Sequence, residues 1–320
     1  MRVRLVKPPI VQNEVRGVGV YGRNLTEELG KVPSLEITDN NPDLVHFLYF
    51  DPFFLTLPPI RKTKTVVTVF DLTPIVLPNL YPRGVRGEIK WQIQKRLLKS
   101  VDAIITISQS AKNDIVKIIG IPQEKVFVTY LAAGTECKKL NLRKKDFILY
   151  IGDVNANKNI FNLLKAIAIL PNQKLVLVGK AFVEPELPEA RAIRDEIKNL
   201  GIEDRVTLAG YVSDEEKIVL LNKAAVYVQP SIYEGFGLPV LEAMSCGTPV
   251  VCGRNSSLPE IAGEAAIFAD VINPQDLAQK IIMAKKGELV AKGLVQAKKF
   301  SWEKTARESY KIYEKVLAGK

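Results

Sequence analysis

The chain has 320 residues, enough for two domains of ordinary size. Its 47% hydrophobic and 25% charged residues are typical of soluble globular proteins and exclude the disordered and fibrous classes. Three cysteines without a CxxC spacing, together with a single histidine, exclude a His/Cys zinc site and argue against a disulfide framework. The formal charge of +10 favours an acidic partner such as nucleic acid, an anionic lipid surface or a phosphorylated small molecule, although good solubility alone would also explain it.

The first ten residues, MRVRLVKPPI, are too charged and hold too few apolar side chains for a secretory signal peptide. No stretch of the sequence reaches the apolar length that is needed to span a bilayer. The cysteine content fits a reducing compartment. We therefore expect a cytoplasmic protein, which would meet a membrane only from its surface.

Short runs of β-branched and other apolar residues recur along the chain and alternate with longer stretches of helical spacing. Many of these runs are continuously apolar, which is typical of parallel strands that are covered on both faces. The predicted strands form a first and a second series: Val3–Val6, Leu44–Leu48, Thr65–Phe70, Ala103–Thr106 and Val126–Thr129, then Phe147–Ile151, Lys174–Val178, Val206–Leu208, Ala225–Gln229, Pro249–Cys252 and Ala265–Phe268.

Amphipathic helices are predicted between the strands, for example Val20–Leu29, Ile160–Leu170 and Leu277–Ala284. Two series of alternating strands and helices predict two doubly wound α/β domains. The polar stretch Lys138–Asp146 separates the series, so we assign residues 1–142 to a first domain and residues 143–300 to a second. The pattern alone allows the last helix, Trp302–Leu317, to pack on either domain.

The segment Ser231–Val251 (SIYEGFGLPVLEAMSCGTPVV) holds the strongest functional signals of the chain. A buried strand ends just before it, and a glycine-rich loop then leads to Pro239, a favoured residue at the start of a helix. That helix ends at Gly247, a typical stop residue, and another strand follows. Because ligands of doubly wound sheets bind beyond the carboxyl ends of strands, the loop Glu234–Leu238 is expected to face a ligand.

The chemistry of this loop suits a diphosphate and the sugars attached to it. Its glycines let backbone N–H groups approach a ligand closely, and the N-terminus of the following helix favours an anion. Glu242, placed near the end of the first helical turn, can accept two hydrogen bonds from a ribose diol, and Glu234 can reach sugar hydroxyls. Acidic residues near a helix start can also serve only to complement the helix dipole, and each glutamate taken singly allows that interpretation.

The spacing of Glu234 and Glu242 within EGFGLPVLEAMSCGTPVV resembles the E-x7-E signature of glycosyltransferase family 4, the retaining group with the GT-B fold. The resemblance implies an α/β GT-B protein, in which two Rossmann-like doubly wound domains face each other across a cleft. It implies that Glu242 binds the donor ribose and that Glu234 contacts the donor sugar near the reacting centre. The backbone that would line the donor pocket belongs to Gly235, Phe236, Gly237 and Leu238.

Other segments of the second domain are similar to the same family. YIGDVNANKNIFNLLKAI resembles its first strand, loop and helix, and Lys158 matches a basic residue that binds the donor phosphates. The helix dipole disfavours a lysine at a helix start, so this position fits a bound anion, although a solvated surface lysine is the alternative. Asp153 stands where the family often has an arginine, so the phosphate contacts are expected to differ. Weaker similarities concern three pairs of residues at further strand ends. Tyr211 and Val212 would hold the nucleobase, and the other two pairs are Gly179 and Lys180, and Ser256 and Ser257.

In the first domain, RGVGVYGRNL resembles the glycine loop that opens the family's acceptor domain, where Gly17 and Gly19 would approach the donor phosphate and the acceptor. VVTVFDLTPI resembles a strand that ends in a His-Asp pair in the family. Phe70 replaces that histidine, which contacts the donor sugar in many relatives, and Phe70 cannot form the hydrogen bond. Either the sugar preference differs, or Asp71 supplies the polar contact. The single histidine, His46, is interpreted as structural.

The segment Arg83–Lys99 is predicted to form a basic amphipathic helix. Arg86 and Lys90 share one face of this helix, and Ile89, Ile93 and Leu97 share another. Such a helix can lie on an anionic membrane, and the lipid-linked acceptors of many family members are compatible with that interpretation. The alternative, which the pattern slightly favours, is that the apolar face is buried in the protein and the basic side is solvated.

The resemblance extends over essentially the whole chain, because FSWEKTARESYKIYEKVL is similar to the family's last helix, which returns to the first domain; residues 301–320 are therefore assigned there. It implies that a hexose is transferred from a GDP- or UDP-sugar to a glycan or lipid-linked acceptor with retention of configuration. The FDLTP and GDVNANKN segments are most similar to mannosyl- and rhamnosyl-type relatives. The predicted catalytic residues are Glu234, Lys158 and Asp71.

No cofactor and no metal ion are expected for this reaction. GT-B enzymes generally do without a bound metal, and the second domain has no DxD pair at a strand end. Lys158, the helix starts and the loop N–H groups would instead stabilise the leaving diphosphate. The acidic partner indicated by the net charge is therefore expected to be a nucleotide sugar or a lipid surface, and not nucleic acid.

Three other functions are compatible with parts of the sequence. A GT-B-fold nucleotide-sugar epimerase would use the same donor pocket without an acceptor. Phe70 in place of a histidine weakens the case for any enzyme that uses acid/base catalysis. The intact glutamate pair argues against a catalytically silent module that only binds nucleotide sugars. A nicotinamide dehydrogenase is least favoured, because no GxGxxG with a later acidic residue follows the first strand.

Overall fold

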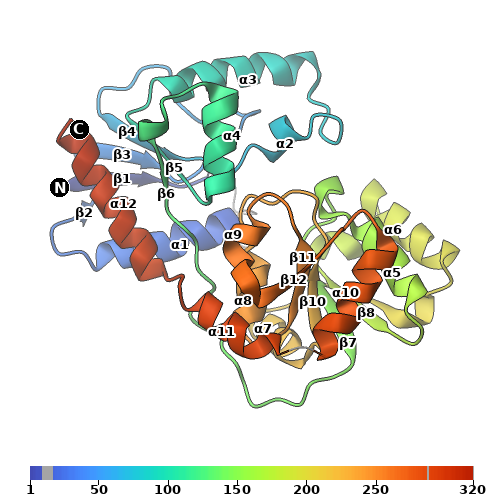
Figure 1. The fold of residues 1–320 in the computed structure, drawn as a ribbon. Helices are drawn as coiled ribbons and strands as arrows, with labels where there is room; N and C mark the ends of the chain where they lie inside the picture. Colours follow the sequence, from blue (N-terminus) through green and yellow to red (C-terminus); the bar gives the residue numbers. More distant parts are fainter. Residues whose placement is uncertain (9–16, 287, 320) are drawn as a thin grey trace. The chain divides into compact units, whose positions relative to one another are not determined.

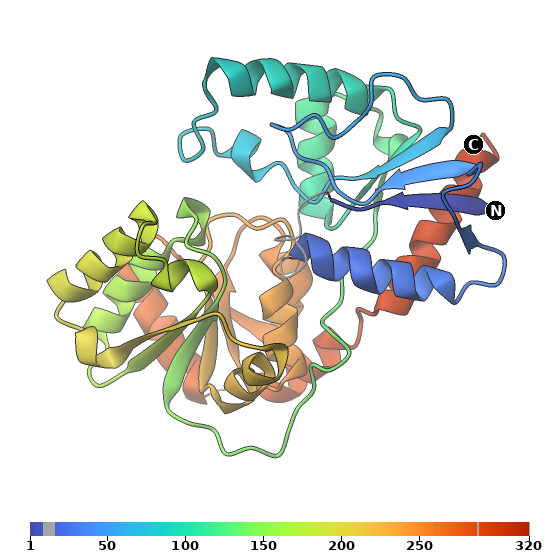
Figure 2. The same cartoon turned by 180° about the vertical axis from the view of Figure 1, so that it is seen from behind.

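A computed structural model describes residues 1–8, 17–286 and 288–319 of the chain, which divides into two compact units (Figures 1 and 2). The first unit comprises residues 1–132 and 300–320, and the second comprises residues 133–299. The first boundary lies before the predicted position at residue 142. The reason is that the intervening segment packs on the second unit: the Leu140 N–H donates to Asn222 Oδ1 at 2.7 Å, and Cys137 belongs to that unit's core.

The first unit is built around a six-stranded parallel sheet with the strand order β2-β1-β3-β4-β5-β6. Five of its strands lie where the sequence predicts strands. The short β2 is not predicted, because its two residues are both exposed and form no apolar run. The strands are β1 (Arg2–Val6), β2 (Glu36–Ile37), β3 (Leu44–Phe47), β4 (Lys64–Thr68), β5 (Ala103–Thr106) and β6 (Val126–Val128).

Helices cover both faces of this first sheet (Figure 1). Val67 and Ile104 point to one face and pack in a core with α3 and α4, whereas the adjacent Thr68 points to the other face and contacts Tyr21 of α1. Alternate residues of each strand are therefore buried on opposite sides, which explains the continuously apolar strand sequences. The helices are α1 (Gly17–Gly30), α2 (Thr73–Val76), α3 (Gly84–Lys99), α4 (Gln109–Ile119) and α12 (Trp302–Leu317).

The second unit also contains a six-stranded parallel sheet, in the order β12-β11-β10-β7-β8-β9. Numbered from the start of this unit, its strands follow the order 3-2-1-4-5-6 of dinucleotide-binding Rossmann sheets. The order reverses between the adjacent strands β7 and β10. The strands are β7 (Phe147–Ile151), β8 (Lys174–Val178), β9 (Val206–Gly210), β10 (Val226–Gln229), β11 (Val250–Gly253) and β12 (Ala266–Ala269).

The second sheet is likewise covered on both faces. Ile148 and Tyr150 of β7 pack in one core with α5, α6 and α10, whereas Phe147 and Leu149 pack in another with α7, α8 and α9. The helices are α5 (Ile160–Ile169), α6 (Pro188–Asn199), α7 (Asp214–Lys223), α8 (Leu238–Ser245), α9 (Leu258–Ala262), α10 (Pro274–Lys286) and α11 (Leu289–Ala297).

Helix α3 contradicts the favoured interpretation of its apolar face. Ile89 and Ile93, which the pattern assigns to a buried face, are 56% and 43% exposed, and only Leu97 of that predicted face packs, partly buried, against the core. The face that packs on the first unit is formed by Trp91, Gln94 and Leu98, which are spaced at i, i+3 and i+7. The helix thus has a second apolar stripe, and the sequence pattern does not show which stripe the core selects.

Among the described residues, no helix combines the length and the apolar character that crossing a membrane requires.

Candidate functional site

The carboxyl ends of β7 and β10 lie next to each other where the strand order of the second sheet reverses. Ligands of doubly wound sheets bind at such switch points. Lys158 follows β7 at the end of the short helix η3 (Ala156–Lys158), and Glu234 follows β10. Their side chains meet there, with Lys158 Nζ 2.8 and 2.9 Å from the two carboxylate oxygens of Glu234. Two predicted site residues that lie 76 positions apart are therefore in direct contact.

One backbone hydrogen bond and two from asparagine side chains hold the loops that follow β7 and β10 against each other. The Ile232 N–H donates to the Asn157 carbonyl at 2.9 Å, and Asn157 Nδ2 donates to the Tyr233 carbonyl at 3.0 Å. Asn159, which has a left-handed φ of 57°, donates from Nδ2 to the Pro230 carbonyl at 3.0 Å. These contacts hold the two loops so that the side chains of Lys158 and Glu234 face each other.

The Glu234 carboxylate is bound on several sides and is only 8% exposed. Besides Lys158, its Oε1 accepts hydrogen bonds from Gln229 Nε2 at 2.8 Å and from Ser231 Oγ at 2.6 Å. The Glu234 backbone N–H donates to Ser256 Oγ at 2.8 Å. A buried carboxylate is costly unless it is both paired and hydrogen-bonded, and these contacts supply both conditions.

The glycine-rich loop turns sharply into α8 and is held by the serine loop after β11. Gly237 precedes the helix with a φ of 96°, and a Cβ atom at this position would lie 2.8 Å from Leu258 Cδ2. Only glycine therefore fits without rearrangement. Ser257 Oγ donates to the carbonyl groups of Glu234 and Phe236, both at 2.9 Å. The loop is thus fixed at the N-terminus of α8, and the N-terminus of a helix favours an anion.

Glu242 is the fifth residue of α8, one residue further into the helix than predicted, because the helix begins at Leu238 and not at Pro239. It is 6% exposed, and its Oε1 lies 3.0 Å from Lys217 Nζ on α7. Burial raises the pKa of the Glu242 carboxyl, and the Lys217 charge acts against this shift. Burial acts to lower the pKa of Lys217, but the neighbouring carboxylate outweighs it and raises the pKa above its ordinary value. Each glutamate of the E-x7-E pair is therefore matched by one lysine.

Gly179 lies at the end of β8, close to the end of β7. A Cβ atom here would lie 2.1 Å from the Gly152 carbonyl oxygen, and the Gly179 N–H donates to the Gly210 carbonyl at 2.8 Å. The position therefore has no room for a side chain. Lys180 does not join the two lysine–glutamate pairs: its ammonium lies at the surface, 3.5 Å from Glu184.

The predicted nucleobase residues follow β9 at the same carboxyl edge of the sheet. Tyr211 is exposed, and Val212 is partly buried against the second unit's core. Asp153, at the place of the expected arginine, organises the turn after β7. Its Oδ1 accepts a hydrogen bond from the Val154 N–H at 2.9 Å, and its carbonyl accepts one from the Tyr150 hydroxyl at 2.9 Å.

The predicted glycine loop of the first unit is helical from its first described residue onward. Gly17 is the first residue of α1, and Gly19 lies in its first turn. Residues 9–16, which include the arginine of the motif, lie outside the described residues. The expectation that Gly17 and Gly19 belong to a loop is therefore wrong. Their contact with the donor stays a prediction.

Phe70 and Asp71 follow β4 in the first unit. The Phe70 ring packs edge-on against Tyr21, with 5.2 Å between the ring centroids. Asp71 Oδ1 accepts a hydrogen bond from the Thr73 N–H at 2.8 Å, at the start of α2. Asp71 thus shapes this turn, and its predicted contact with the donor sugar remains a prediction.

His46 is fully buried in β3 and has a partner at each ring nitrogen. Nδ1 lies 2.6 Å from the Tyr313 hydroxyl, and Nε2 lies 2.7 Å from Thr68 Oγ1. The Tyr21 hydroxyl lies 2.9 Å from the same threonine oxygen. Burial lowers the pKa of His46 to about 3, so the ring is neutral at neutral pH. The structural interpretation of this histidine agrees with these contacts.

Three partners of the glutamates are not identified by the sequence. Gln229 and Ser231 flank the end of β10, and a polar residue that closes the apolar strand VYVQ is a signal that could have indicated the first of them. Lys217 carries no comparable signal. It reaches Glu242 from another helix, 25 positions earlier in the chain, so only the tertiary fold brings the two together.

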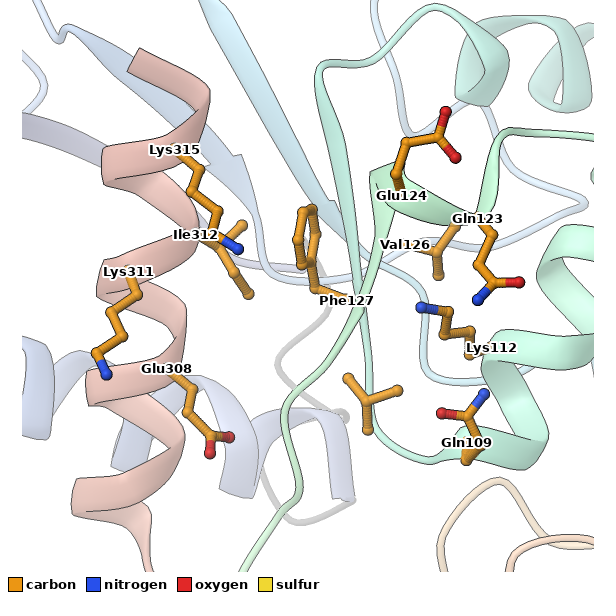
Figure 3. Close-up of a pocket in the computed structure, with 11 residues that line it drawn as sticks. Gln109, Lys112, Gln123, Glu124, Val126, Phe127, Glu308, Lys311, Ile312 and Lys315 are labelled. Carbon is orange, nitrogen blue, oxygen red and sulfur yellow. The ribbon is translucent and has the colours of Figure 1, made fainter. Parts of the chain in front are cut away.

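Two shallow hollows in the described structure are lined by none of the predicted site residues. One of about 370 Å³ lies in the first unit between α12 and the edge strand β6, where Phe127 lies between Lys112 and Lys315 (Figure 3). The other, of about 450 Å³, lies in the second unit, where the Arg254 guanidinium is 4.4 Å from the Phe268 ring centre. Across the described residues, no three His, Cys, Asp or Glu side chains gather so that they could hold a metal ion.

Solved structures with a similar backbone identify the fold class. Sucrose-phosphate synthase from Thermosynechococcus elongatus matches with a TM-score of 0.82 at 20% identity, over 100% of both chains. HepE of Anabaena, solved in complex with UDP-glucose, matches with a TM-score of 0.75 at 17% identity, over 99% of both chains. The chain has the two-domain α/β GT-B fold.

Sequence comparisons identify the family. The model of group 1 glycosyl transferases matches residues 134–301, and that of Glycosyltransferase Family 4 matches residues 31–135. The O-antigen chain mannosyltransferase B of Escherichia coli is 31% identical, over 85% of this chain and 75% of its own length. The MMP alpha-(1->4)-mannosyltransferase of Mycolicibacterium hassiacum is 32% identical over 71% of this chain, which spans only 57% of that relative. The chain spans only 40% of the serotype-specific mannosyltransferase WbdA of Escherichia coli, at 28% identity. With a group 1 match over more than half of its length, the chain belongs to glycosyltransferase family 4.

Proposed function

We propose that the protein transfers a hexose from a nucleoside diphosphate sugar to an acceptor hydroxyl, with retention of the anomeric configuration. The observation that carries this proposal is the contact between Lys158 and Glu234 at the switch point of the second sheet, next to the N-terminus of α8. Family membership supports the class of reaction. The contact supports the assignment of Lys158 and Glu234 as residues that take part in it.

In the proposed reaction, negative charge develops on the diphosphate as its bond to the sugar breaks. Lys158 can serve both partners, because an ammonium group has three hydrogen-bond donors and can hold Glu234 and a phosphate oxygen together. The N–H groups of residues 235–238 and the N-terminus of α8 add further positive potential. The acceptor hydroxyl then attacks from the face that the phosphate leaves, and a phosphate oxygen takes its proton. This scheme needs no separate catalytic base.

The two glutamates receive different roles in the proposal. Glu234 faces the sugar hydroxyls and the carbon at which positive charge develops. Glu242 accepts hydrogen bonds from the ribose diol, and this role requires an ionised carboxylate. Burial opposes ionisation of Glu242, and the Lys217 ammonium at 3.0 Å acts in the other direction by favouring the charged carboxylate. The backbone of Tyr211 and Val212 would hold the nucleobase.

Mannose is the proposed sugar, because the names of several relatives are those of mannosyltransferases. The proposed donor is a GDP- or UDP-sugar; a structural neighbour solved with UDP-glucose supports the second. A glycan or lipid-linked acceptor is proposed, since one relative is named for an O-antigen chain. The proposal includes no cofactor and no metal ion, because lysines and backbone N–H groups supply the positive charge. A cytoplasmic location is proposed, in keeping with three free and buried cysteines.

The test of this proposal is a panel of GDP- and UDP-sugars, each incubated with the protein in the presence and absence of glycan and lipid-linked acceptors. We expect the nucleoside diphosphate to be released faster when the right acceptor is present, and the product to keep the donor's anomeric configuration. An isomerised donor without release would instead identify an epimerase. Donor binding without either reaction would identify a silent binding module, and both of these results would overturn the proposal.

A further inference from the structure

One surface of the first unit combines exposed apolar side chains with positive charge. On α3, Val85, Ile89 and Ile93 recur at every fourth position and are 78%, 56% and 43% exposed. Arg86 and Lys90 are exposed on the adjacent face of the helix, each one position after an apolar residue of this row. Residues spaced by four lie one above another on a helix, so the three apolar side chains form a continuous stripe with cations along it.

The loop between β3 and β4, residues 48–63, is held against α3 by hydrogen bonds. The buried Gln94 of α3 donates from Nε2 to Thr56 Oγ1 at 2.6 Å and to the carbonyl of Phe54. Lys90 Nζ lies 5.5 Å from the centre of the Phe54 ring. The loop is therefore held against α3, and the Phe54 side chain lies next to the helix at Lys90.

The loop adds three more exposed apolar side chains: Phe54, Leu55 and Ile60 are 62%, 65% and 79% exposed. Together with the α3 stripe and its cations Arg86 and Lys90, they form what is called here the basic-apolar surface. Exposed apolar side chains that gather in this way on one part of a domain mark interaction sites.

The charge of α3 selects among the partners that could cover this surface. The helix sequence GVRGEIKWQIQKRLLK holds one acidic residue, Glu88, and its carboxylate lies 2.6 Å from the guanidinium of Arg83. A second copy of the chain on the same surface would place like charges against each other, which is destabilising. Anionic lipid headgroups would neutralise the cations, while the apolar side chains entered the boundary between headgroups and acyl chains.

We propose that the basic-apolar surface binds the headgroup region of an anionic lipid membrane. Phe54, Leu55 and the α3 stripe enter the membrane interface, and Arg86 and Lys90 contact lipid phosphates. The binding is peripheral and reversible, and it weakens as salt screens the charges. This inference rests on the proposed transfer to a lipid-linked acceptor, because attachment to the membrane would hold the enzyme where that acceptor is located.

The first arm of the test removes apolar contacts. The full-length chain is sedimented with vesicles of phosphatidylglycerol and phosphatidylcholine, and with vesicles of phosphatidylcholine alone. Ile89→Ser/Ile93→Ser is compared with Ile282→Ser/Met283→Ser on α10 of the second unit, whose side chains are similarly exposed, at 44% and 47%. We expect the α3 variant to lower partitioning onto anionic vesicles by about tenfold or more, and the α10 variant to leave it within about twofold of the wild type.

The second arm reverses charge. Arg86→Glu/Lys90→Glu is compared with Lys198→Glu/Lys292→Glu, which changes the net charge equally at exposed positions of α6 and α11. We expect the α3 variant to lose about tenfold or more of the anionic-vesicle partitioning, and the control pair to lose far less. All variants replace exposed side chains, and far-UV circular dichroism verifies that they remain folded.

Several results would overturn the proposal. Equal binding to both kinds of vesicle would remove the role of anionic lipid, and equal losses in the α3 and control variants would remove the role of this surface. A dimer of the wild type that the α3 variants abolish, without vesicle binding, would make the surface an interface between copies. The measurement needs no sugar transfer, so its failure is distinguishable from failure of the proposed activity.

Discussion

The two units bury polar side chains in different ways, and the difference separates a structural network from a candidate active site. In the first unit, His46, Thr68, Tyr21 and Tyr313 are fully buried and joined by contacts of 2.6 to 2.9 Å. Every member is uncharged at neutral pH, because burial lowers the pKa of the histidine and raises the pKa of each tyrosine. Such a network needs only hydrogen bonds to be stable, and it offers no charge to a ligand.

The buried polar network of the second unit contains charges, and it lies at the carboxyl edge of its sheet. Lys158 and Glu234 form one pair, and Lys217 and Glu242 form the other. Replacing buried ion pairs by apolar side chains is often neutral or stabilising, so stability alone does not explain their presence. Burial of polar groups is therefore common to both units, whereas paired charge at the carboxyl edge of a sheet, as in the second unit, is typical of a ligand-binding site.

The largest effect is expected for Glu234→Gln, which keeps the shape of the side chain and removes its charge. We expect turnover to fall by about 100- to 1000-fold, because the developing positive charge of the sugar loses its carboxylate. The Michaelis constant for the donor is expected to change much less. Steady-state release of the nucleoside diphosphate measures both quantities. The matched control is Glu184→Gln at the surface of the same unit, and equal turnover of the two variants would exclude Glu234 from the reaction.

The second prediction tests the other pair. Lys217→Met leaves the Glu242 carboxylate buried without a partner, and we expect the free energy of unfolding to fall by about 3 kcal/mol or more. Both this variant and Glu242→Ala are expected to weaken donor binding. The double variant Lys217→Met/Glu242→Leu is expected to recover stability but not donor affinity. Urea unfolding followed by circular dichroism and calorimetric titration of the donor give the two values. Donor affinity that returns together with stability would show that the pair is only structural.

The sequence predicts much of the fold and one half of this site, for a physical reason. Strands buried on both faces leave continuous apolar runs, and the two glutamates with their glycines lie within one local segment around α8. The lysine partners come from elsewhere: Lys158 meets Glu234 across 76 positions, and Lys217 meets Glu242 across 25. The motif similarity identifies the first lysine, but only the strand order and the packing of α7 on α8 create the contacts.

Helix α3 shows a second limit of the sequence. It carries two apolar stripes, one with Trp91 and Leu98 and the other with Ile89 and Ile93, and each has the spacing of a helix that packs on a core. The core of the first unit takes the stripe with the large tryptophan ring and leaves the other exposed. A choice between two adequate faces depends on the shape of the surface they meet, and the helix sequence does not contain that shape.

The third prediction concerns the neutral network. The pKa of His46 is about 3 in the folded protein and close to 6.5 when unfolded, so the unfolded chain binds more protons below pH 6.5. Stability is therefore complete above pH 6.5 and is lost as the pH falls toward 3. Between pH 7 and pH 5, protonation of this histidine in the unfolded chain should lower the free energy of unfolding by about 2 kcal/mol. His46→Gln should remove that part of the pH dependence.

Tryptophan fluorescence during urea unfolding measures this loss, because the chain's two tryptophans, Trp91 and Trp302, both lie in the first unit. Donor binding at pH 7 is expected to be unchanged in His46→Gln. If this variant lost donor affinity while its stability kept the same pH dependence, the histidine network would belong to the functional part of the molecule. The contrast between the two units would then fail.

The smallest effect is expected at Gln229, a neutral member of the charged network. Its Nε2 donates to Glu234 Oε1 at 2.8 Å, so Gln229→Leu removes one hydrogen bond from the carboxylate and leaves Lys158 in place. A hydrogen bond to a charged group contributes about 1.5 to 3 kcal/mol, so we expect turnover to fall about tenfold, with little change in the Michaelis constant for the donor. Gln173→Leu is the matched control, since Gln173 is also buried in the second unit but contacts Asp146 and Lys285. Equal losses of turnover in the two variants would reflect stability alone, whereas a loss confined to Gln229→Leu would mean that the uncharged members of the second network act by positioning Glu234.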